Sequence, residues 1–138
     1  MNTGRVIAGG LLAGLILNIG EAVLHGVLLD AQTTEAMNAL GKEIVGSPLG
    51  ITLLILITFA QGLIGMWLYA AINPRSGALT AVGIGMVLWL LSSVYSAIYL
   101  HAGFAGVFPN PVVWWPVAWE CIEYPLAILV GALVYKGK

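Results

Sequence analysis

The first apolar run of the chain reads VIAGGLLAGLILNIGEAVLHGVLL at residues 6–29 and contains no lysine or arginine. At a rise of about 1.5 Å per residue, a helix of this length crosses a hydrocarbon core of about 30 Å. Arg5 and Asp30 bound the run, so it predicts a transmembrane helix. We expect this helix to be retained, because the run is too long for the apolar part of a signal peptide and has no clear small-residue cleavage site.

Three further apolar runs occupy residues 49–72, 78–100 and 113–135, and they also lack lysine and arginine. Backbone groups in lipid must be satisfied internally, and apolar runs this long do so as helices. The chain of 138 residues is 60% hydrophobic and 8% charged, whereas a soluble domain is about 25% charged. The sequence therefore predicts an all-α integral membrane protein, with residues 1–138 forming a single four-helix transmembrane bundle.

The composition also excludes several classes of function. A formal net charge of −1 without a basic cluster argues against nucleic acid as a partner, since phosphate contacts need clustered lysine and arginine. Cys121 is the only cysteine, which excludes an internal disulfide and any Cys-x-x-Cys motif. The chain lacks a sizeable soluble loop, which argues against an enzyme with a bulky polar substrate, although acid–base chemistry on a lipid stays open.

The positive charges indicate an orientation. If all four runs span the membrane, Arg5, Arg75, Lys136 and Lys138 fall on one side and Lys42 on the other. The positive-inside rule then places both termini in the cytoplasm, with the bacterial inner membrane as the expected location.

The longest connection is predicted to contain a short helix at about residues 33–44. Met37, Leu40 and Ile44 recur there at helical spacing, and either Thr33 or Thr34 is suited to cap the helix start. Such a helix is expected to lie on the outer membrane interface.

Each predicted span carries one seam of polar and small residues at alternating steps of four and three, which is the spacing of a single helix face. The remaining faces are mostly aliphatic. The seams consist of Gly14, Asn18, Glu21 and His25; of Leu54, Thr58, Gln61, Gly65 and Leu68; of Gly85, Trp89, Ser92, Ser96, Tyr99 and Gly103; and of Pro116, Glu120, Glu123, Ala127 and Gly131. Seams of this composition predict the interior of a helix bundle in lipid.

The charged seam residues share one layer in the outer half of the predicted bundle. Glu21 and His25 lie about 12 and 6 Å below the outer end of the first span, and Glu120 and Glu123 lie about 10 and 15 Å deep in the fourth. Charged groups at such depth cost several kcal/mol, so the four residues predict one shared site. Neighbouring polar residues are expected to support it, and His101 is a further candidate ligand. The supporting set is Asn18, Gln61, Ser92, Tyr95, Ser96 and Tyr99.

The chemistry of this predicted site has three readings. Imidazole and carboxylate are ligands for zinc, iron and copper. Two carboxylates three residues apart in a low dielectric do not both ionise without a cation between them, which favours a proton site. Internal hydrogen bonds that fix the helix register need no ligand at all. The Glu-x-x-His pairs of a di-iron carboxylate bundle are missing.

Three functions follow from these readings. The sequence favours a small membrane protein that binds a metal ion, a haem or a chlorophyll-type pigment in its bundle, as a subunit of a larger membrane complex. The first alternative is a proton- or cation-coupled transporter or channel subunit. The second is a structural accessory subunit. The expected partners are the lipid bilayer and other membrane subunits or further copies of the chain. A Gly-x-x-x-Gly motif at Gly10 and Gly14 predicts helix contacts either within the bundle or between subunits.

Overall fold

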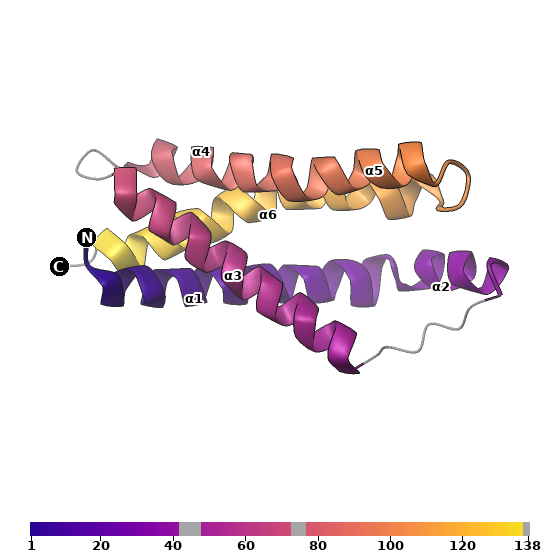
Figure 1. Ribbon diagram of the computed structural model, residues 1–138, viewed down its shortest axis with the longest axis horizontal. Coiled ribbons are helices and arrows are strands. Elements are labelled where there is room, and N and C mark those ends of the chain that lie inside the picture. Colours follow the sequence, from indigo (N-terminus) through magenta and orange to yellow (C-terminus); the bar gives the residue numbers. More distant parts are fainter. Residues whose placement is uncertain (42–47, 73–76, 137–138) are drawn as a thin grey trace.

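The computed structural model describes residues 1–41, 48–72 and 77–136, which are almost entirely helical and form no strand within these ranges (Figure 1). Two of the helices contain a turn of π-helix, labelled η1 and η2. In chain order the elements are α1 (Thr3–Val23), η1 (Leu24–Leu28), α2 (Asp30–Ala39), α3 (Pro48–Ile72), α4 (Ala78–Trp89), η2 (Leu90–Val94), α5 (Tyr95–Gly103) and α6 (Asn110–Lys136).

Four helices in the described residues are long and apolar enough to cross a membrane: Thr3–Leu28, Pro48–Ile72, Ala78–Gly103 and Asn110–Tyr135. The predicted fold class is thus confirmed, with small differences at the ends. The first helix begins at Thr3 because the Asn2 side chain accepts a hydrogen bond from the Arg5 amide at 3.1 Å, as an N-cap does. The fourth span also begins earlier than predicted, since Pro111 is readily accommodated in a first helical turn.

The spans run alternately in opposite directions. Figure 1 places the first residues of α1, the last turns of α3 and α6 and the first turn of α4 at one end of the bundle. This arrangement agrees with the predicted grouping of termini and short turn on one side. The cations Lys42, Arg75 and Lys138, on which the predicted orientation depends, lie outside the described residues.

The short helix predicted between the first two spans is present as α2. It covers Asp30–Ala39 and ends at a turn in which Gly41 has a φ of +66°, a value that favours glycine. In Figure 1, α2 continues the line of α1 and does not turn across the end of the bundle. Residues 42–44 of the predicted helix fall outside the described residues.

Glycines bring the helices into contact at the end of the bundle that holds the termini. A Cβ on Gly131 of α6 would come within 2.6 Å of the Gly9 carbonyl oxygen of α1, so the two backbones touch. A Cβ on Gly62 of α3 would lie 2.5 Å from the backbone of Gly10 and Gly14. The Gly-x-x-x-Gly motif therefore serves contacts within the bundle.

α6 is central because it packs against both α1 and α4, while α3 packs mainly on α1. Towards its N-terminus α3 diverges from the other helices in Figure 1, and every residue from 51 to 57 is exposed. The core is closed at the opposite end of α3, where Tyr69 meets Tyr135 edge to face with ring centroids 5.9 Å apart.

Candidate functional site

The two carboxylates of α6 are buried inside the bundle. Glu120 and Glu123 are each 7% exposed, and they lie on the same face as the buried Ala127 and Gly131. The seam predicted for the fourth span is therefore the face that α6 turns to the other helices. A spacing of three residues places the two carboxyl groups about one turn apart.

Glu120 has one direct hydrogen-bond partner on the neighbouring span. The buried Ser93 hydroxyl donates to Oε2 of Glu120. Ser93 lies in η2, where Tyr95 N–H reaches back to the Leu90 carbonyl in an i to i+5 bond. The π turn and the hydrogen bond thus occur at the same point of the structure.

Glu123 lies against the backbone of α1. A Cβ added to Gly20 would overlap the Glu123 carboxyl group, so a larger residue at position 20 would require the end of that side chain to shift. By strict geometry, neither buried carboxyl oxygen of Glu123 has a hydrogen-bond partner among the described residues. The buried indole N–H of Trp119 is nevertheless close enough to act on this carboxyl group as a donor. A buried polar group without a partner costs about 1–3 kcal/mol, and an ionised one costs more.

Glu21 and His25 form a second polar pair at the edge of the site. His25 Nε2 is 3.2 Å from Glu21 Oε2. The imidazole is about half exposed and Glu21 is partly buried. Both residues lie within electrostatic range of Glu120 on α6. His25 belongs to η1, in which the Leu29 amide bonds the Leu24 carbonyl at 2.9 Å.

Two amides continue the polar layer towards α3. The Tyr124 hydroxyl donates to Gln61 Oε1 at 3.0 Å. Asn18 Nδ2 donates to the Gly14 carbonyl at 2.8 Å and reaches the Ile55 carbonyl at 3.4 Å. Gln61 and Asn18 therefore bind other groups of the bundle and, within the part of the chain that the structure describes, make no hydrogen bond to a carboxylate.

The structure does not bring Tyr95, Ser96 and Tyr99 to the carboxylates. Tyr95 is 65% exposed, Tyr99 is 56% exposed and Ser96 is also on the surface. The predicted seam assumed 3.6 residues per turn throughout, whereas η2 inserts one extra residue and turns the following helix face by about 100°. Ser92 lies within η2 and donates to the Leu88 carbonyl at 2.7 Å.

His101, the additional candidate ligand, is exposed at the end of α5 and its ring centroid lies 5.6 Å from that of Trp114. Across the described ranges, no three His, Cys, Asp or Glu side chains come close enough together to hold a metal ion. The four predicted site residues therefore share a layer without converging on one point.

Four residues of the site were missed by the sequence analysis: Gly20, Ser93, Trp119 and Tyr124. Gly20, Trp119 and Tyr124 are each adjacent in sequence to a glutamate of the predicted site, which is a signal that could have drawn attention to them. Ser93 had no such signal, because regular helical spacing places Ser92 on the inner face.

Comparison with protein-family models, curated proteins and solved structures finds no match. The chemistry of the site must therefore be argued from its own residues.

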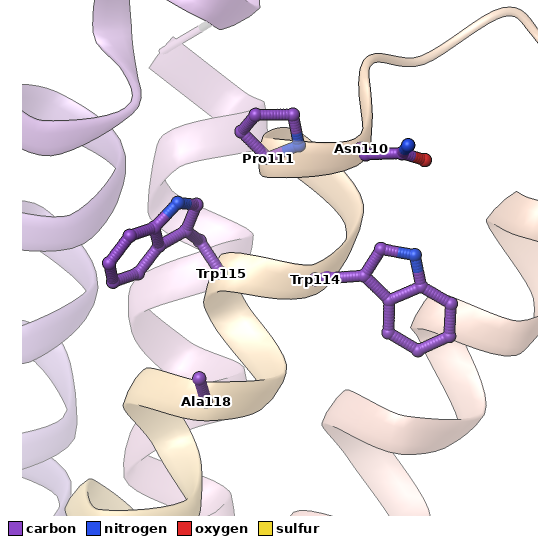
Figure 2. Close-up of a pocket in the computed structure, with 5 residues that line it drawn as sticks. All are labelled: Asn110, Pro111, Trp114, Trp115 and Ala118. Atoms are coloured by element: carbon purple, nitrogen blue, oxygen red, sulfur yellow. The ribbon is translucent and has the colours of Figure 1, made fainter.

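An open hollow of about 370 Å³ lies at the start of α6, lined by Asn110, Pro111, Trp114, Trp115 and Ala118 (Figure 2). Figure 2 shows the two indole rings on opposite sides of the helix. All the lining residues belong to α6, and no carboxylate is among them. Exposed tryptophans at this end agree with the aromatic residues expected near a membrane interface.

Proposed function

We propose that this chain is a small integral membrane protein that binds and releases protons on Glu123 and Glu120, as part of a proton-coupled transporter or channel. Of the three functions that the sequence suggests, the site geometry supports this one best. A proton needs no ligand cage and no cavity, and it is the ligand that a closely packed carboxyl group accepts.

The observation that carries the proposal is the environment of Glu123. Its two carboxyl oxygens are buried, have only the loosely placed Trp119 indole as a donor among the described residues, and lie against the α1 backbone at Gly20. An ionised carboxylate with so little hydrogen bonding in a low-dielectric interior is very costly, whereas the neutral acid is tolerated. Glu123 is thus suited to hold a proton and to release it only when its surroundings change.

A route for protons to this site is supplied by the more exposed pair. His25 and Glu21 are in contact with each other, and His25 reaches the surface. Imidazole exchanges protons in the physiological pH range. Glu120 lies within electrostatic range of this pair and of Glu123, so protons would enter through His25 and Glu21 and pass to the two buried acids.

Proton movement in liposomes tests this function. The purified chain is reconstituted with an internal pH-sensitive dye, and a pH gradient is applied under a potassium diffusion potential. We expect proton uptake in the wild type, loss of uptake in Glu123→Gln, and wild-type uptake in the matched control Glu35→Gln, because Glu35 is an exposed residue of α2 outside the spans. Equal uptake in the wild type and Glu123→Gln would refute the proposal.

Binding of a metal ion or a pigment is a second candidate function, favoured by the contact between His25 and Glu21. One imidazole and one carboxylate are half of a common ligand set, and Glu120 would have to move to join them. Elemental analysis and an absorption spectrum of the purified protein decide this alternative. Metal or pigment in stoichiometric amount, lost in His25→Ala, would favour it over proton binding.

We further propose that the chain resides in a bacterial inner membrane with both termini in the cytoplasm, assembled with other subunits or with copies of itself. The distribution of cations in the sequence supports this orientation. A purely structural accessory role would predict that Glu21→Gln and Glu123→Gln together leave the function of such an assembly intact.

A further inference from the structure

Beyond Trp89, most polar residues of the third span do not lie on the face that the structure buries. Regular helical spacing from Gly85 and Trp89 leads to Ser92, Ser96 and Tyr99, a complete polar seam. The structure instead turns Ser93 and Ala97 inward, and Ala97 is only 2% exposed. The two patterns differ by one residue, which is the extra residue that η2 contains.

The first half of the span is fixed against α6. A Cβ on Gly85 would lie 2.6 Å from the Pro125 nitrogen, so these two backbones are in contact. The Trp89 indole donates to the Val117 carbonyl at 2.8 Å. Any change in the π turn must therefore appear as a rotation of α5 and leave α4 in place.

The Ser93–Glu120 hydrogen bond is the contact that depends on the π turn. π-helices are rare and are disfavoured relative to the α-helix, so each needs a compensating interaction. Ser93 is buried, and its hydroxyl binds Glu120 only because the extra residue places it on the inner face. In a regular helix, Ser92 would take this position.

We propose that the span Ala78–Gly103 has two registers and that the Ser93–Glu120 hydrogen bond selects between them. In the π register, Ser93 binds Glu120 and Ser96 and Tyr99 face outward. In the regular register, Ser92 replaces Ser93, Ser96 and Tyr99 turn inward, and Ala97 turns outward. The inference goes beyond proton binding and does not depend on it, because any event that removes Ser93 from Glu120 would rotate α5.

Rotation of α5 would move a row of exposed aromatic rings. Tyr95 stacks on Tyr99 with ring centroids 6.4 Å apart, and Tyr99 contacts Phe104 at 5.7 Å. These rings lie on α5 and at its end, beyond η2. The buried site and this surface are thereby coupled through a single turn of helix.

Spin labels read the register directly. A nitroxide is attached to single cysteines at Ser96 or Ala97 in a Cys121→Ala background, and collisions with oxygen, which concentrates in lipid, measure lipid exposure. With Ser93 intact, we expect the label at 96 to be exposed and the label at 97 to be buried. In Ser93→Ala we expect the label at 96 to be buried and the label at 97 to be exposed, because the helix register shifts by one residue.

Deletion of Leu91 is the matched control. It removes the extra residue, so a regular helix keeps Ser93 and Ala97 on the inner face, and Ser93→Ala should no longer change the exposure of either label. The proposal is overturned if Ser93→Ala leaves the exposures unchanged in the full-length chain, or if the same reversal occurs after the deletion. It is also overturned if the label at 97 is already exposed with Ser93 intact.

Discussion

Gly20 and Glu123 form the most closely packed contact of the candidate site. The absence of a side chain on Gly20 leaves space that the Glu123 carboxyl group fills. This contact joins α1 to α6 at the level of the polar layer.

We predict that Gly20→Ala destabilises the protein by about 1–3 kcal/mol, the usual cost of overpacking a well-filled interior. The loss should be much smaller in a Glu123→Ala background, since the group that the new methyl meets is then absent. Unfolding in mixed detergent micelles measures all four members of this double-mutant cycle. Additive losses would contradict the contact between the two residues.

At the scale of the helices, glycine positions decide how closely the spans approach one another. In the sequence, a glycine that packs against another helix looks the same as one that faces lipid, because both occur in apolar runs. Gly131 contacts the Gly9 backbone, whereas a Cβ on Gly83 would meet nothing within 4 Å. The two positions are therefore a natural matched pair.

We expect Gly131→Ala to destabilise the bundle by about 1–3 kcal/mol through overpacking. Gly83→Ala should be neutral or slightly stabilising, because alanine is the better helix former and the site has room. Thermal unfolding in the same detergent compares the two variants. A similar effect of both substitutions would argue against the close contact of α1 and α6.

The residues of the third span whose positions the sequence did not predict lie in or beyond the π turn η2. The inner face of α6 was predicted correctly at Glu120 and Glu123, because that helix keeps a regular period past both residues. In the third span, the extra residue of η2 moved Ser96 and Tyr99 outward and brought Ser93 inward. A π turn is stabilised by a contact with another helix, here Glu120, and such a contact leaves no periodic signal in the sequence.

At the scale of the whole molecule, hydropathy alone was sufficient for the architecture. Each of the four predicted spans is found within a few residues of its expected ends. Local effects set those ends, such as the Asn2 cap of α1. Hydropathy does not encode how the helices approach one another, so the divergence of the N-terminal half of α3 was not predicted.

The orientation of the bundle gives a prediction at this scale. Fusing a reporter that is active only in the cytoplasm to the N-terminus or to the C-terminus should give activity in both cases, because both ends lie at the same end of the bundle (Figure 1) and the cations favour the inner side. A fusion in the connection after α2, at the opposite end, should be inactive. Activity at only one terminus would contradict the arrangement of four spans.

The central claim is that Glu123 carries a proton inside the bundle. Infrared spectroscopy of the protein in lipid, in H₂O and in D₂O, detects the carbonyl stretch of a protonated carboxyl group and its isotope shift. At neutral pH we predict this band in the wild type and in the control Glu35→Gln, with a loss of intensity in Glu123→Gln. A wild-type spectrum without the band, or an undiminished band in Glu123→Gln, would contradict the account.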